Sequence, residues 1–110
     1  MEPKEKRYIK VRYALCLNKI IAANRIKAKE NKTGGPKDHT FINSLRKLEA
    51  ASGISFPIIQ SISKGIKNPA LTTVIALAEG LNITPGHFFS LFDEITEEEI
   101  KAAMAKTKKK

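Results

Sequence analysis

The stretch SGISFPIIQSISKG, residues 52–65, contains two glycines that frame a short helical pattern. Gly53 comes just after an apolar-periodic segment, where glycine adopts the left-handed backbone at low cost and ends a helix. Ser55 is a good N-cap for the next helix, and Pro57 stands in a first turn where its missing amide hydrogen does no harm. Gly65 ends this second helix. The stretch therefore predicts two helices joined by a tight turn.

Apolar residues recur at helical spacing through most of the chain. The predicted helices cover residues 14–30, 41–52, 55–64, 71–81 and 84–92, with a sixth short helix or a frayed tail from residue 96. Thr40 and Thr84 are the predicted N-caps of the second and fifth helices, and Thr96 with Glu99 forms a capping-box signature. Residues 8–13, YIKVRY, alternate apolar and charged side chains and predict a short strand.

These elements predict an all-α protein with three parts. Residues 1–13 form a basic N-terminal arm, residues 14–92 a compact five-helix domain, and residues 93–110 a C-terminal helix with a Lys-rich tail. No apolar run approaches transmembrane length, and the charged N-terminus lacks the apolar segment of a signal peptide. We therefore expect a cytoplasmic protein with no membrane partner.

Charge is distributed unevenly along the chain. The formal net charge is +9, and residues 1–50 carry 13 Lys and Arg against 5 Asp and Glu. This excess favours a polyanionic partner, because counterions released from phosphates drive binding. It is also typical of an ordinary solvated surface, so charge alone does not decide between the two interpretations.

Residues that could carry catalytic or metal chemistry are few. Cys16 is the single cysteine, which excludes an intramolecular disulfide and a multi-cysteine zinc site, and its apolar neighbours predict a core position. His39 and His87 lack partner carboxylates at ligand spacing. No nucleophile–base pair and no phosphate-binding glycine loop after a strand is visible. We expect neither an enzyme nor a bound metal or cofactor.

Residues 41–92 contain a series of positions in a fixed order and spacing: Leu48, Gly53, Ile54, Ser55, Ile59, Ile62, Gly65, Asn68, Pro69, Thr73, Leu77, Ala78, Leu81, Ile83, Phe88 and Phe89. With these residues the segment resembles the helix-turn-helix domain of the Xre family, which includes phage repressors and Cro proteins. The resemblance implies a lambda-repressor-like fold in which helix 55–64 protrudes, supported from behind by Ile54, Ile59 and Ile62. It also implies a prokaryotic or phage-type regulator that binds double-stranded DNA sequence-specifically, most simply a repressor that occupies a promoter and associates with the nucleoid.

The same resemblance implies which side chains contact DNA. The base-reading positions of the family fall on Phe56, Pro57, Gln60 and Ser61. The phosphate-binding positions fall on Ser44, Ser55, Lys64, Lys67 and Asn68. Of the base-reading set, Gln60 could pair with adenine, and Phe56 could contact a thymine methyl or wedge at a base step. Basic residues of the first helix and the loop after it could extend the positive surface: Arg25, Lys27, Lys29, Lys32 and Lys37.

Three features depart from the family pattern. Glu49 stands where the family usually has alanine, and a glutamate there must swing out or push the two motif helices apart. Leu45 replaces a polar residue that helps to hold a phosphate in the family. Phe41 and Ile42 indicate that the first motif helix begins earlier here than is usual.

The resemblance also implies partners. One such domain reads only a few base pairs, so we expect a homodimer on a pseudo-palindromic operator. Its contact surface would come from the YIKVRY arm pairing as a strand or, preferably, from C-terminal apolar residues, namely Leu91, Phe92, Ile95, Ile100 and Met104. The alternative is an antitoxin-like or adaptor protein, because the apolar Phe56-Pro57-Ile58 surface also fits burial against a protein partner.

Overall fold

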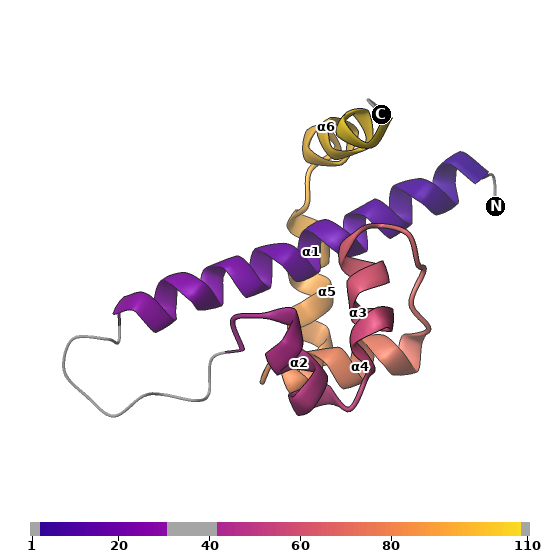
Figure 1. The fold of residues 1–110 in the computed structure, drawn as a ribbon. Coiled ribbons are helices and arrows are strands. Elements are labelled where there is room, and N and C mark those ends of the chain that lie inside the picture. The colour runs from indigo at the N-terminus through magenta and orange to yellow at the C-terminus, as the bar shows by residue number, and fades with distance from the viewer. Residues whose placement is uncertain (1–2, 31–41, 109–110) are drawn as a thin grey trace.

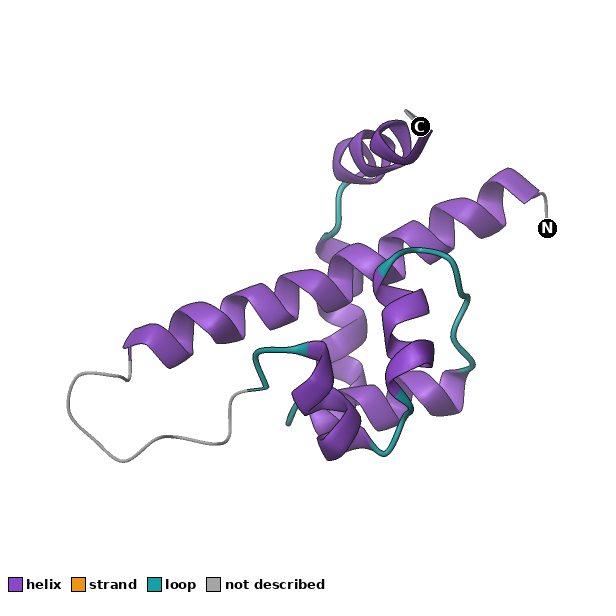
Figure 2. Ribbon diagram, viewed as in Figure 1, coloured by secondary structure: helices purple, strands orange, loops and turns teal. Residues whose placement is uncertain are grey.

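The computed structural model describes residues 3–30 and 42–108, and this part of the chain folds into six α-helices with no strand (Figures 1 and 2). The helices are α1 (Pro3–Glu30), α2 (Leu45–Ser52), α3 (Phe56–Ser63), α4 (Leu71–Gly80), α5 (Pro85–Glu94) and α6 (Glu97–Lys108). The all-α prediction is confirmed, and the C-terminal tail forms a helix.

The first helix is much longer than the sequence pattern indicated. The prediction of an N-terminal arm with a strand at residues 8–13 is wrong, because α1 already begins at Pro3. Val11 and Ala14 are buried and continue the helical stripe of Leu17 and Ile21 toward the N-terminus. The local alternation in YIKVRY therefore gives way to tertiary packing: Tyr13 lies against the aromatic rings of α5, with its centroid 4.8 Å from that of Phe92.

Side-chain caps fix the starts of three helices. Ser44 accepts a hydrogen bond from the Lys47 amide at 3.2 Å and caps α2. The predicted start of this helix at residue 41 is wrong, since residues 42–44 are not helical; Thr40, its predicted cap, lies outside the described residues. Thr84 caps α5 as predicted, with its hydroxyl accepting from the His87 amide. The predicted capping box of α6 is also present, since Thr96 and Glu99 exchange hydrogen bonds of 3.1 Å.

A single apolar core joins all six helices around α1. In Figure 1, α1 crosses the molecule with the α2–α5 group on one side and α6 on the other, and α1 contacts α3, α5 and α6. The buried core residues are Val11, Cys16, Leu17, Ile20, Ile21, Leu48, Ile59, Ile62, Val74, Leu77, Ala78, Leu81, Phe88, Ile95 and Ile100.

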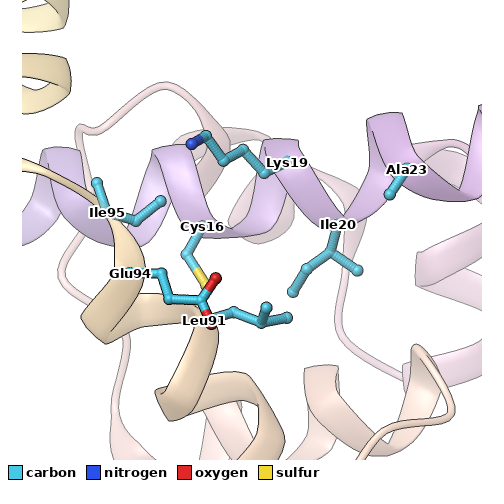
Figure 3. Close-up of a pocket in the computed structure, with 7 residues that line it drawn as sticks. All are labelled: Cys16, Lys19, Ile20, Ala23, Leu91, Glu94 and Ile95. Carbon is cyan, nitrogen blue, oxygen red and sulfur yellow. The ribbon is translucent and has the colours of Figure 1, made fainter.

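A hollow of about 280 Å³ lies between α1 and α5 (Figure 3). It is lined by Cys16, Lys19, Ile20, Ala23, Leu91, Glu94 and Ile95, and so by no residue of α2 or α3. The Cys16 thiol is 1% exposed and donates to the Phe88 carbonyl, and burial raises its pKa to about 12. This thiol stays protonated near neutral pH, as suits the core residue that the sequence predicted.

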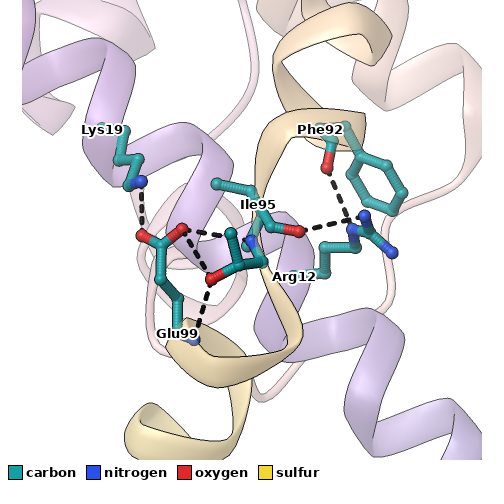
Figure 4. A network of polar contacts seen from close by, with 6 residues as sticks. Arg12, Lys19, Phe92, Ile95 and Glu99 are labelled. Carbon is teal, nitrogen blue, oxygen red and sulfur yellow. Dashed lines mark hydrogen bonds and ion pairs between the residues drawn. The ribbon is translucent and has the colours of Figure 1, made fainter.

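Polar side chains of α1 donate hydrogen bonds to carbonyl groups at the ends of other helices. At the end of α5, the Arg12 guanidinium donates to the carbonyls of Phe92 at 2.9 Å and Ile95 at 3.1 Å (Figure 4). It also donates to the Asp93 carbonyl at 3.3 Å. At the end of α3, the Asn18 amide donates to the Ser63 carbonyl at 3.0 Å. These bonds fix where α3 and α5 end relative to α1.

The last helix packs back onto α1. Lys19 of α1 forms an ion pair with Glu99 in the first turn of α6 (Figure 4). Ile95 and Ile100, on either side of this turn, are 3% and 0% exposed. The predicted C-terminal dimer surface is therefore wrong for these two residues, because α1 already covers them within one chain. The alternative surface, the paired strand at residues 8–13, is excluded since that segment is helical.

Replacement of Arg12 tests its role at the end of α5. We expect Arg12→Met, which retains an unbranched apolar stem but removes the donors, to lower the free energy of unfolding by about 1–3 kcal/mol, because three helix-end carbonyls lose a charged partner. Urea denaturation followed by circular dichroism measures this change. Lys6→Met, at an exposed position on the same helix, is the matched control and should have little effect. Equal loss in both variants would contradict the assignment.

The attachment of α6 should depend on pH. The hydrogen bond from Lys19, followed by that from the Thr96 amide, lowers the pKa of Glu99 below its ordinary 4.5. The carboxylate therefore stabilises the fold at pH values above 4.5, and this contribution is lost as the pH falls through the lower, folded-state pKa. We expect Glu99→Gln to lower the melting temperature at pH 7, with the difference from the unmodified protein vanishing at strongly acidic pH. Glu98→Gln, in the same turn, is the control; a pH-independent difference for Glu99→Gln would contradict the pairing.

Candidate nucleic-acid interface

The tight turn between α2 and α3 forms where the sequence predicted it. Gly53 adopts the left-handed conformation, with φ of 76°, and its amide donates to the Glu49 carbonyl at 3.0 Å. The Ile54 amide donates to the Ser52 hydroxyl at 3.1 Å, so the next backbone donor is satisfied as well. The chain therefore changes direction in three residues and begins α3 at Phe56.

One face of α3 is anchored and the opposite face is open. Ile59 and Ile62 are 0% and 2% exposed and pack into the core, while the predicted base-reading positions lie on the other face, where residues four apart share a side. Pro57 is exposed, and Gln60 and Ser61 are partly exposed. The structure therefore brings Phe56, Pro57, Gln60 and Ser61 together on the outward side of α3.

The N-terminus of α3 is capped by Glu49, one of the residues that depart from the family pattern. Ser55 precedes the helix as predicted, but its hydroxyl forms no capping hydrogen bond. Instead, the Glu49 carboxylate accepts from the Phe56 amide at 2.8 Å. The prediction of a Ser55 side-chain cap is wrong, and the Glu49 carboxylate does not swing out but is directed at the start of α3. A carboxylate is favourable here, since the start of a helix carries partial positive charge.

Arg46 belongs to the same surface and was missed by sequence reasoning. Its guanidinium lies over the ring of Phe56, with the guanidinium carbon 3.9 Å from the ring centroid. Arg46 and Glu49 are three residues apart on α2, which places both on the side that faces the start of α3. That spacing is visible in the sequence, but nothing in a linear pattern indicates that the two side chains meet Phe56.

The predicted phosphate-binding residues lie at three places in the motif: the start of α2, the start of α3 and the segment after α3. Lys64, Lys67 and Asn68 are exposed at the end of α3 and in the loop that follows it. Ser55 is exposed at the start of α3, and its hydroxyl is not used in capping. Ser44 stands apart from them at the start of α2, where its hydroxyl accepts from the Lys47 amide.

The basic extension of this surface along α1 is described only in part. Arg25 is exposed and donates to the Asn43 carbonyl at 3.0 Å, and Lys27 is exposed two residues further on. The side chain of Lys29, and Lys32 and Lys37 altogether, lie outside the described residues. The bond from Arg25 and that from Asn24 to the Ile42 carbonyl tie α1 to the segment that leads into α2.

Leu45, which stands where the family usually has a polar residue, is part of the apolar packing of the domain. Its side chain is partly buried and packs against the core, so it is not placed to bind a phosphate.

No group of three or more His, Cys, Asp or Glu in the described part of the chain could hold a metal ion. His87 is exposed on α5, and His39 lies outside the described residues. None of the helices described is both long enough and apolar enough to cross a membrane.

Comparison with protein families gives one match. Residues 43–88, which include α2, α3, α4 and the start of α5, match the family model described as Helix-turn-helix. This segment is therefore a helix-turn-helix domain of the Xre type. This family consists of DNA-binding regulatory domains, which are generally non-enzymatic. A search of curated proteins found no match, and neither did a search of solved structures. The helices α1 and α6 lie outside the matched segment.

Substitution of Glu49 tests its role as the cap of α3. We expect Glu49→Ala, which restores the residue usual in the family, to lower the free energy of unfolding by about 0.5–2 kcal/mol, because the Phe56 amide loses its acceptor. Glu49→Gln should lose less, since its amide oxygen can still accept. Lys47→Ala, at an exposed position of α2, controls for the change in helix composition. The cap assignment is contradicted if Glu49→Ala is as stable as the unmodified protein in denaturant titration.

Proposed function

We propose that the protein is a sequence-specific transcriptional regulator that inserts α3 into the major groove of double-stranded DNA. The observation that supports this best is the two-sided character of α3: Ile59 and Ile62 fix its inner face, while Gln60 and Ser61 stand on the outer face. In helix-turn-helix proteins the second helix of the motif reads base edges and the first crosses the backbone. The family match and the net charge of +9 agree with such a role.

The proposed contacts divide into two classes. Base edges are read from the outward face of α3, where Gln60 and Ser61 supply hydrogen-bonding groups and Phe56 and Pro57 supply apolar surface. Phosphates are bound by Ser44, Ser55, Lys64, Lys67 and Asn68, which position the protein without reading sequence. In this scheme, the outward face of α3 supplies specificity, and the residues at the ends of α3 and at the start of α2 supply affinity.

The biological setting follows from this limited reading surface. A single α3 contacts few base pairs, so the regulator acts as a homodimer on a pseudo-palindromic operator with half-sites about one helical turn apart. It represses by occupying a promoter in the cytoplasm of a prokaryotic cell, in association with the nucleoid.

A second function is supported by one observation. The outward face of α3 also carries Ile58, which is 38% exposed, beside Pro57. Exposed apolar groups on an otherwise polar face fit burial against a protein, as in an antitoxin or adaptor. Replacement of Gln60 distinguishes the two functions. It should weaken binding to DNA, but not binding to a protein partner held through the apolar groups, because that partner does not need the Gln60 amide.

DNA binding tests the proposal directly. The unmodified protein should prefer the duplex upstream of its own gene to a scrambled duplex by about a thousandfold at physiological salt. Gln60→Ala should cost about 1–3 kcal/mol on the upstream duplex and little on the scrambled one, because a base contact is lost. Lys67→Ala should weaken both duplexes equally and reduce the salt slope by about one, because a phosphate contact is lost.

The matched control is Lys101→Ala, which removes a positive charge from an exposed position on α6. It should leave the preference and the slope nearly unchanged. Equal binding of the two duplexes that collapses as salt rises would refute the sequence-specific proposal and favour the protein-partner function.

A further inference from the structure

The contact between Arg46 and Phe56 joins the two helices of the motif on its outer face. The guanidinium lies 3.9 Å from the centroid of the Phe56 ring, within the range of a cation–π interaction. The backbone of the same residue is held by Glu49 at 2.8 Å. Thus α2 holds Phe56 at two points, and the ring in turn supports the arginine.

The hydrogen-bonding groups of Arg46 are not used within the described part of the chain. Among residues 3–30 and 42–108, its guanidinium forms no hydrogen bond and no ion pair, although Glu49 lies one turn away on the same helix. A guanidinium that stacks on a ring keeps its N–H groups in its own plane, so stacking leaves the donors available. Arg46 is exposed, and Phe56 is only half-buried beneath it.

We infer that Arg46 is a DNA phosphate-binding residue and that Phe56 is the residue that positions it. This inference rests on the proposed function and deepens it: the class of ligand is the phosphodiester group of the DNA backbone. Two parallel N–H groups of a guanidinium match two phosphate oxygens, a geometry that lysine cannot reproduce.

The location of Arg46 favours phosphate over a base edge. Arg46 lies in the first turn of α2, and the first helix of such a motif crosses the DNA backbone while the second enters the groove. Its contact with Phe56 places it at the N-terminal edge of α3, beside the outward face. Phe56 therefore serves as a platform for Arg46, and this role replaces the apolar base contact that the family resemblance and the proposed function gave it, leaving base reading to Pro57, Gln60 and Ser61.

The inference is tested by a double-mutant cycle measured on both the upstream and the scrambled duplex. We expect Arg46→Ala to weaken binding to each duplex by about tenfold and to lower the salt slope by about one. Phe56→Leu, which keeps apolar bulk without a ring, should weaken both duplexes severalfold, whereas Phe56→Tyr should bind like the unmodified protein. In the Arg46→Ala background, Phe56→Leu should have no further effect, because its role is to hold the arginine.

Two controls separate this contact from general charge and from loss of folding. Lys47→Ala removes a neighbouring charge from the same helix, and its effect should be unchanged by Phe56→Leu. Replacement of single phosphates by neutral methylphosphonates should identify one position at which the unmodified protein loses affinity and Arg46→Ala does not. Circular dichroism checks that each variant is helical.

The outcomes distinguish failure of the inference from failure of the proposed function. Suppose that Phe56→Leu weakens binding to the upstream duplex alone, and by the same factor in the unmodified protein and in the Arg46→Ala variant. Phe56 then reads a base, and the inference is overturned. It is also overturned if Arg46→Ala binds both duplexes normally. If the unmodified protein shows no sequence preference, the proposed function fails. Binding to the scrambled duplex still decides the inference: non-additive losses in the double variant support it, and additive losses overturn it. Absence of binding to either duplex overturns both.

Discussion

The architecture depends on one helix that supplies hydrogen-bond donors to carbonyl groups elsewhere in the chain. Carbonyls at helix ends have no partner within their own helix and cost free energy when they are removed from water. Arg12 satisfies those at the end of α5, and Asn18 satisfies Ser63 at the end of α3. Asn24, which is 8% exposed, donates to the Ile42 carbonyl just before α2. Because these donors lie on one rigid helix, they fix the end of α3, the end of α5 and the entry to α2 relative to one another, and so orient the proposed reading helix.

The contact between α2 and α3 shows how one substitution within a family can be compensated by another. The family usually has a small residue where this chain has Glu49, and a polar residue where it has Leu45. Here the glutamate carboxylate caps α3, the role that the Ser55 hydroxyl does not perform, and Leu45 adds to the apolar core. The phosphate contact that Leu45 cannot make is replaced, in our proposal, by Arg46 on the next position of the same helix. Two of the departures from the family pattern, Glu49 and Leu45, thus have structural roles, and Glu49 and Arg46 meet at Phe56.

Local signals in the sequence predicted the middle of the fold well. Gly53, Thr84 and the Thr96–Glu99 box each determine a helix end through their own backbone or the next turn, so these ends could be read without tertiary information. The outward face of α3 followed from the spacing of Ile59 and Ile62. The N-terminal half of α1 could not be predicted in this way, because Tyr8–Tyr13 alternates at a period of two and its helix is stabilised by α5 and α6, distant in sequence. The roles of Glu49 and Arg46 were missed for the same reason, since both depend on contacts across the turn and not on a pattern along one helix.

The composition of the outward face limits how specificity can arise under the proposed function. Of its four base-reading positions, only Gln60 and Ser61 carry side-chain hydrogen-bonding groups, and one good side-chain pair discriminates a base by about 1–3 kcal/mol. A single copy therefore falls short of the discrimination of about 4–10 kcal/mol that specific regulators achieve over non-specific DNA. The remainder must come from a second copy on a symmetric site or from the deformability of DNA, which phosphate contacts can sense. If Arg46 is held rigidly on Phe56, its contact tolerates little variation in the position of the DNA phosphate. A phosphate contact, which reads no base, then contributes to the recognition of DNA shape. This links the stacked arginine to specificity although it touches no base.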